Sequence, residues 1–196
     1  MGNFFSNNSD YHRYSNSMTP MIDLILMEND KPDRIINFAK LYPEKVNDYS
    51  MLGFNALMYA CTSNKKPEIV QILLDHGANV NAHAKYVNLS RGTTALMIAS
   101  TCKRYEDELV NPNIETVQLL LKYGANVNSV DSNGDTALLL ACQDADICDN
   151  YDIIKLLIDS GSNIKAINSK KQTALSILES YESNNNINLI KKLLIE

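Results

Sequence analysis

Two near copies of one phrase decide the fold, HGANVN at His76–Asn81 and YGANVN at Tyr123–Asn128. Each copy follows a matching apolar stretch, EIVQILLD before the first and ETVQLLLK before the second. Agreement over so many positions indicates a repeated structural unit, because chance does not reproduce both the phrase and its surroundings. The sequence therefore predicts an array of similar units.

A second recurring phrase gives the register of the array. It contains an Ala-Leu pair in NALMYAC, TTALMIAS, DTALLLAC and QTALSIL, with the Ala at positions 56, 95, 137 and 174. The spacings of 39, 42 and 37 residues are uneven, so we expect insertions in otherwise similar units. Two long insertions fall at Ala84–Arg91 and Lys103–Asn111, and both are predicted to be surface loops.

Each unit is predicted to contain two helices. The first helix carries the small residues of the Ala-Leu phrase, which allow a neighbouring helix to approach closely. The second carries a wide apolar face, as in Ile69–Leu74 and Val117–Leu121, which is typical of helices packed on more than one side. Gly77, Gly124 and Gly161 are predicted to end the second helices, where a left-handed backbone is needed.

Together these phrases resemble the ankyrin repeat family. Its pattern is roughly G-x-T-P-L-H-x-A-A, an outer helix ending in L-L, and then G-A-D-V-N with a β-turn finger. The resemblance covers residues 20–196 and implies an all-α solenoid of helix-turn-helix units with β-turn fingers. It implies a flexible N-terminal arm at 1–19 and units at about 20–51, 52–91, 92–133, 134–170 and 171–196.

The chain departs from the family pattern at two positions. The Pro of the pattern is Ala in four units, and its His is replaced by Met58, Met97, Leu139 and Ser176. The hydrogen bonds that this His makes between repeats are therefore expected to be absent. We expect side-chain packing to supply the cohesion, and the array to be looser than an ideal one.

Composition narrows the classes of partner and location. The net charge is −5 and no block of Lys or Arg stands out, so we expect no nucleic-acid partner. The sequence has no transmembrane-length apolar run and no secretory signal. We therefore expect a cytoplasmic protein whose four cysteines remain thiols.

No motif of the sequence indicates catalysis or metal binding. GxSxG, HExxH and Gly-rich phosphate loops are absent, so we expect no enzyme, no catalytic residue and no cofactor. The scattered Cys and His residues do not complete a zinc set. The acidic stretch Asp144–Asp152 lacks the central Gly of a calcium loop and has Lys155 at the twelfth position. The cysteines are expected to serve only as small buried side chains. The acidic stretch is expected to be a solvated loop.

The resemblance implies that the protein binds another protein through fingers, inner helices and long inter-helix loops. Ordinary loop surface is the alternative for each candidate residue. The candidates from the two long insertions are chosen because Tyr and Arg are favoured as interface anchors. They are Tyr86, Arg91, Arg104 and Tyr105. The full candidate set is Phe54, Thr62, Tyr86, Arg91, Thr93, Arg104, Tyr105, Val130, Asp131, Ser132, Asp135, Gln143 and Lys170. We expect a monomer whose partner is a protein that the sequence does not identify.

The N-terminus supports an alternative function. MGNFFS fits the N-myristoylation pattern M-G-x-x-x-[ST] with Gly2 as the acceptor, and an unmodified arm is the other interpretation. A single myristoyl chain binds membranes only marginally, and the arm has no Cys and only Arg13 as a fixed positive charge. The alternative is therefore an adaptor that recruits a target protein reversibly to a membrane surface.

Two further expectations concern the finger asparagines and the source of the chain. Asn81 and Asn128 are similar in position to ankyrin asparagines that the oxygen-sensing asparaginyl hydroxylase modifies; stabilisation of the finger is the alternative. Richness in Asn, Ile and Lys without Trp is typical of an AT-rich genome, such as that of a large DNA virus, an intracellular bacterium or an amoeba. For the first two sources, we expect a host protein as the partner, in the host cytoplasm.

Overall fold

The computed structural model describes residues 20–27, 32–62, 67–85, 91–105, 108–182 and 184–195. For residues 104, 105 and 108 it describes the backbone alone. The arm predicted at 1–19 lies outside the described residues.

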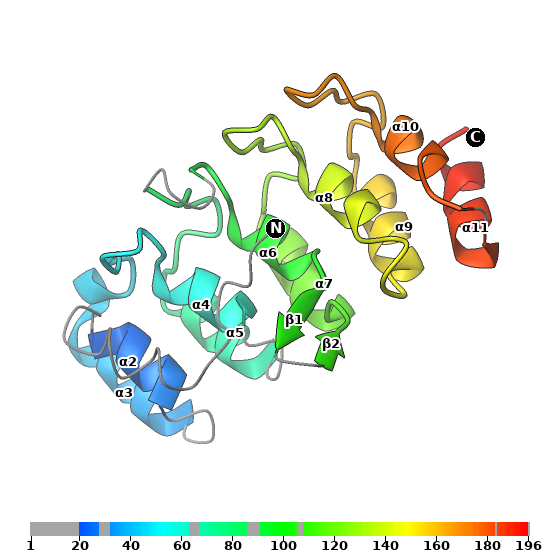
Figure 1. Ribbon diagram of the computed structural model, residues 1–196. Helices are drawn as coiled ribbons and strands as arrows, with labels where there is room; N and C mark the ends of the chain where they lie inside the picture. Colours follow the sequence, from blue (N-terminus) through cyan, green and yellow to red (C-terminus); the bar gives the residue numbers. More distant parts are fainter. Residues whose placement is uncertain are drawn as a thin grey trace.

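Helices in the described residues form five pairs that stack side by side (Figure 1). The first helices of the pairs form an inner row, and the second helices form an outer row. Each helix contacts its counterpart in the next pair, so the predicted all-α solenoid is confirmed. The pairs are α2 (Pro20–Met27) with α3 (Pro32–Leu41), α4 (Ala56–Thr62) with α5 (Pro67–Asp75), α6 (Ala95–Ala99) with α7 (Ile114–Lys122), α8 (Ala137–Gln143) with α9 (Tyr151–Asp159), and α10 (Ala174–Glu179) with α11 (Asn185–Leu193). A short 3-10 turn, η2 (Pro43–Lys45), follows α3.

The inner helices begin where the Ala-Leu phrase predicts. The residue before each Ala is the N-cap, and its side-chain oxygen accepts a hydrogen bond from the N–H three residues later. These bonds measure 3.0–3.3 Å and use Asn55, Thr94, Thr136 and Thr173. Such a bond satisfies one of the free N–H groups of the first turn.

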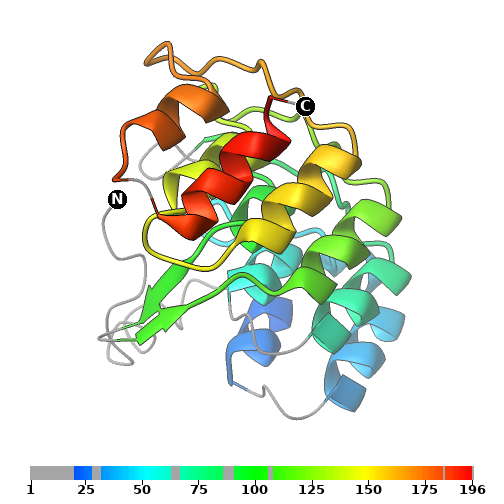
Figure 2. The same cartoon turned by 90° about the vertical axis from the view of Figure 1, so that its right-hand side faces the viewer.

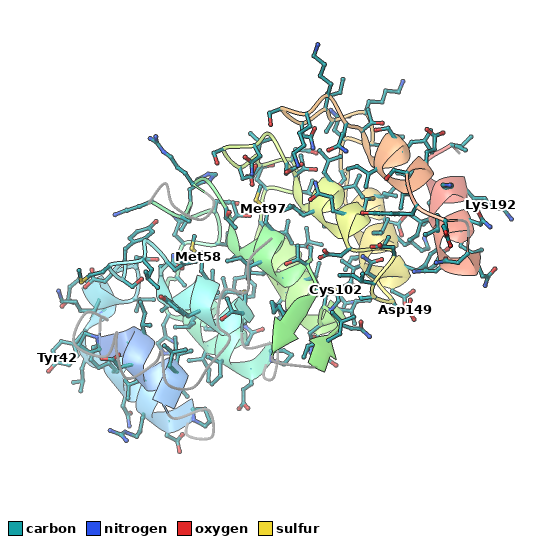
Figure 3. All side chains as sticks on the ribbon, viewed as in Figure 1. Tyr42, Met58, Met97, Cys102, Asp149 and Lys192 are labelled. Carbon is teal, nitrogen blue, oxygen red and sulfur yellow. A yellow bond between two sulfur atoms is a disulfide. The ribbon has the colours of Figure 1, made fainter. Side chains whose placement is uncertain are left out.

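The inner row contains the most continuous part of the core. All side chains of Ala56–Cys61 are buried, because α4 lies between neighbouring inner helices and its own outer helix. Met58 and Met97 follow one another along this row (Figure 3) and are at most 1% exposed. The positions where the family has His therefore hold apolar side chains that pack against neighbours.

The sequence predicted a surface loop at Lys103–Asn111, but this insertion contains two paired strands. Strand β1 (Lys103–Tyr105) pairs antiparallel with β2 (Glu108–Val110), with Arg104 opposite Leu109. Pairing satisfies backbone groups that an isolated loop would leave to water. The resulting hairpin projects from the stack near the connection between α8 and α9 (Figure 2).

The outer helices α5, α7 and α9 end at the glycines that were predicted to end them. Gly77, Gly124 and Gly161 have φ values of 86°, 83° and 90°. These left-handed residues end α5, α7 and α9 and turn the chain towards the fingers.

Candidate functional site

Finger segments extend from one side of the stack, opposite the connections between the two helices of each pair (Figure 1). We define the fingers as residues 47–55, 79–94, 126–136 and 163–173. Each finger joins the outer helix of one pair to the inner helix of the next. The fingers therefore form a row whose spacing is given by the spacing of the helical pairs.

The repeated phrase GANVN builds a ladder of hydrogen bonds between fingers. Oδ1 of Asn81 accepts from the N–H of Asn126 at 2.7 Å, and its Nδ2 donates to the carbonyl of Gly124 at 2.9 Å. Asn128 repeats this arrangement with Asn163 and Gly161, at 2.7 and 3.0 Å. The second Asn of each phrase thus binds the backbone of the following finger.

The ladder also includes the first finger. Asn47 accepts from the N–H of Asn79 at 2.8 Å and donates to the carbonyl of Gly77 at 2.9 Å. The expectation that packing alone holds the repeats together is therefore wrong, because side-chain amides of the fingers also form hydrogen bonds between repeats. Asn81 and Asn128 stabilise the fingers, and their hydroxylation stays a prediction.

The first Asn of each phrase has a local role. Oδ1 of Asn79 accepts from the N–H of Asn81, and the same bond links Asn126 to Asn128 and Asn163 to Lys165, each at 3.0 Å. This Asx turn holds the second position where it can reach the next finger. The N-x-N spacing is thus a structural requirement of the ladder.

Replacing Asn128 with alanine is expected to lower the free energy of unfolding by about 1–2 kcal/mol, because two hydrogen bonds to the next finger are lost. The measurement is urea denaturation followed by circular dichroism. Asn188→Ala, an exposed position on α11, is the matched control and is expected to change stability by less than about 0.5 kcal/mol. Equal effects of the two substitutions would contradict the ladder.

Four of the predicted partner-binding residues lie exposed on the fingers. Arg91, Ser132 and Lys170 are exposed, and Val130 is 53% exposed. The candidates Phe54, Thr62 and Gln143 are half-buried. Tyr86 and Gly2 lie outside the described residues, as do the side chains of Arg104 and Tyr105.

The remaining candidates, Thr93, Asp131 and Asp135, are buried. Oδ1 of Asp131 accepts from the N–H groups of Asn133 and Asp135, at 2.8 and 2.9 Å. Oδ1 of Asp135 accepts from Nδ2 of Asn168 at 2.8 Å. Asp131 therefore shapes its own finger, and Asp135 connects that finger to the next.

Sequence reasoning missed three exposed residues of the last finger, Lys165, Ile167 and Lys171. Ile167 is 62% exposed and occupies the same register as Val130. The register follows from equivalent turns, in which Asp131 N–H donates to the Asp135 carbonyl and Asn168 N–H to the Gln172 carbonyl. Alignment of the two fingers in the sequence could have found this position.

The base of the hairpin joins three repeats through a cluster that we call the clasp: Cys61, Cys102, Lys103, Asp144 and Cys148. Cys102 and Cys148 form a disulfide with Cα atoms 6.6 Å apart, so the prediction that all four cysteines remain thiols is wrong for this pair. Cys61 and Cys142 are free and buried, as expected. Figure 3 shows Cys102 near the α8–α9 connection, which carries the labelled Asp149.

Asp144 holds both halves of the disulfide. Its Oδ2 accepts from the N–H of Cys102 at 2.8 Å, and its carbonyl accepts from the N–H of Cys148 at 3.1 Å. Burial raises the pKa of Asp144 to about 6, against the opposing effect of the Cys102 hydrogen bond. The clasp therefore positions the two cysteines through the backbone as well as through their sulfur atoms.

Lys103 connects the clasp to the preceding repeat. Its Nζ donates a hydrogen bond to the carbonyl of Cys61 in α4. Burial lowers the pKa of Lys103 from 10.5 to about 8, whereas it raises the pKa of Cys61 to about 12. The charged form of Lys103 is thus the costly one in the folded protein.

The contribution of Lys103 to the free energy of unfolding is expected to rise with pH between about 8 and about 10.5, its folded and unfolded pKa values. In this window Lys103 binds more protons in the unfolded chain than in the folded chain, so its contribution increases by on the order of 3 kcal/mol. The measurement is the difference in denaturant midpoint between the wild type and Lys103→Met across this range. The titrations of Cys61 and Cys142 oppose the trend and largely cancel in that difference. A difference that does not change with pH would contradict the assignment.

Neither a metal site nor a membrane span is found in the described ranges. They contain no group of three or more His, Cys, Asp or Glu that could hold a metal ion. They also contain no helix long and apolar enough to cross a membrane.

Comparison with known proteins agrees with the geometry. A family model described as ankyrin repeats (three copies) matches residues 15–110 and 108–196. The chain therefore belongs to the ankyrin repeat family. Members of this family generally serve as non-catalytic scaffolds that bind other proteins. No match was found among the curated proteins compared with the chain.

Proposed function

We propose that this protein binds a partner protein through the exposed row of its fingers. The observation that supports the proposal most is the asparagine ladder, which joins each finger to the next by two side-chain hydrogen bonds. A surface that is already ordered loses little conformational entropy on binding. The fingers thus combine exposure with a fixed geometry.

Apolar side chains at the fingers supply candidate anchors. Met51, Val130 and Ile167 are 72%, 53% and 62% exposed. Large apolar side chains that become buried between partners carry much of the binding energy at the centre of an interface. Arg91, Ser132 and Lys170 are exposed on the second, third and fourth fingers and add polar contacts.

Affinity purification from eukaryotic cells with mass spectrometry tests the proposal. The bait is compared with a double variant, Val130→Asp with Ile167→Asp. The matched control, Leu41→Asp with Ile195→Asp, adds the same charges at two sites that are each 72% exposed and lie outside the fingers. A discrete protein lost with the finger variant and retained with the control supports the proposal. A protein profile that is the same for all three baits would overturn it.

The alternative, a myristoylated adaptor, rests on the motif at Gly2. Gly2→Ala is expected to abolish membrane flotation under this alternative and to leave binding by the fingers unchanged. Flotation that persists in Gly2→Ala would rule the alternative out.

A further inference from the structure

The last three fingers present charges of one sign to solvent. Residues 79–94, 126–136 and 163–173 contain seven charged residues. The two acidic ones, Asp131 and Asp135, are buried. The other five are cationic and exposed: Lys85, Arg91, Lys165, Lys170 and Lys171. The fingers are therefore a basic surface on a chain whose net charge is −5.

We infer that the fingers bind an acidic segment of a partner protein, an inference that rests on the proposed function and names the chemistry of its partner. Two features support it. Exposed cations lie on the finger of Ile167 and on the finger that precedes that of Val130, and no solvent-facing carboxylate of these three fingers opposes an incoming anion. Charge complementarity of this kind selects partners and speeds their association.

The buried carboxylates do not neutralise the surface at the points of contact. Asp131 accepts hydrogen bonds from two backbone N–H groups of its own finger. Asp135 accepts hydrogen bonds from the side-chain amides of Asn168 and Gln143, at 2.8 and 3.2 Å. The Oδ1 atoms of both buried carboxylates thus accept hydrogen bonds from the protein, whereas the five cations are exposed to solvent.

Direct backbone bonds hold the cationic positions at fixed distances. The N–H of Ser132 donates to the carbonyl of Arg91, and the N–H of Ser169 donates to the carbonyl of Asn133, both at 2.7 Å. Lys85 is oriented by the Tyr49 ring, with its Nζ 3.7 Å from the ring centroid. Because the fingers are joined in this way, a segment crossing them meets cations on the finger at 79–94 and on the finger at 163–173, with the exposed Val130 on the finger between them.

One helix connection on the opposite side of the stack carries the opposite charge. The α8–α9 connection exposes Asp146 and Asp149, and Asp152 is exposed in the first turn of α9. Figure 3 shows the labelled Asp149 on this side, away from the fingers. This difference in charge directs an acidic ligand to the fingers and away from the α8–α9 connection.

A protein ligand fits these observations better than a nucleic acid. The exposed Val130 and Ile167 require apolar side chains opposite them, which a phosphate backbone does not supply. The chain is also acidic overall, which opposes non-specific binding to a polyanion.

Selection from a phage-displayed library of short random peptides on the immobilised full chain tests the inference. Bound peptides are expected to be enriched in Asp and Glu next to an apolar residue. Synthetic copies should lose at least about tenfold in affinity to the variant Lys165→Glu, Lys170→Glu, Lys171→Glu. Their affinity should also fall as salt rises from about 0.05 to about 0.5 M.

The control variant, Lys40→Glu, Lys122→Glu, Lys192→Glu, makes the same change in net charge on exposed lysines of the outer helices. It is expected to change affinity less than about twofold, and circular dichroism checks that both variants fold. Peptides without acidic enrichment, equal losses in the two variants, or tighter binding of a labelled single-stranded oligonucleotide would overturn the inference. If the variant Val130→Asp, Ile167→Asp loses binding and the triple lysine variant does not, the proposal of an acidic partner is overturned, but binding by the fingers is still supported. Binding unaffected by either finger variant would overturn both.

Discussion

Reduction of the Cys102–Cys148 disulfide is expected to lower the free energy of unfolding by about 3–4 kcal/mol. The bond closes a loop between residues separated by 46 positions, and opening such a loop returns conformational entropy to the unfolded chain. The clasp also joins the insertion of one repeat to the next repeat, so its loss should separate the unfolding of the two halves of the stack. Urea denaturation with and without dithiothreitol measures the effect.

The Cys148→Ser variant is the control for this experiment. It should start at the reduced wild-type stability and should not respond to dithiothreitol. The other two cysteines do not confuse the result, because burial raises the pKa of Cys61 and of Cys142 to about 12 and keeps both as inert thiols. An equal response of the wild type and Cys148→Ser to dithiothreitol would contradict the disulfide assignment.

Substitution of Gly92 by alanine is expected to cost about 2–4 kcal/mol. The residue has φ +89°, and a Cβ there would lie 3.1 Å from Cα of Asp131 on the next finger. The cost combines the left-handed backbone of a residue with a side chain and the displacement of a neighbouring backbone. Thermal and urea denaturation measure it.

Gly124→Ala separates these two contributions. Gly124 has a similar φ of +83°, but a Cβ there would meet nothing within 4 Å. This variant should therefore lose only the backbone contribution, about 1 kcal/mol. If Gly92→Ala costs no more than Gly124→Ala, the close approach of the fingers does not contribute to stability.

Most of the stack could be predicted from the sequence because its units repeat. Gly77, Gly124 and Gly161 were predicted to be left-handed from one recurring phrase, and each is. The Ala-Leu phrase placed the inner helices in the same way. Repetition turns a weak local signal into a strong one, since the same residue types recur at equivalent positions.

The clasp could not be predicted because it depends on an insertion that no other unit contains. Cys102 and Cys148 lie in different repeats, and nothing in their spacing indicates that the hairpin brings them together. The burial of Lys103 depends on the same hairpin. Insertions interrupt the repeat, so their contacts have no second copy against which to compare them.

The candidate binding surface was predicted in part, for a related reason. Family positions indicated Val130 and Lys170, which are exposed, but also Asp131 and Asp135, which are buried. A polar residue on a finger can face solvent or cap the backbone of its own turn, and the sequence alone does not distinguish these two outcomes. The charge asymmetry of the stack became visible only when the buried carboxylates were separated from the exposed lysines.

Hydrogen–deuterium exchange of the full chain, with and without a bound partner or selected peptide, tests most directly the claim that the fingers are the binding surface. Added protection is expected at residues 82–85, 91–94, 128–135 and 165–172, with little change in the outer helices. Protection confined to the α8–α9 connection or to α11, with the fingers unchanged, would contradict it.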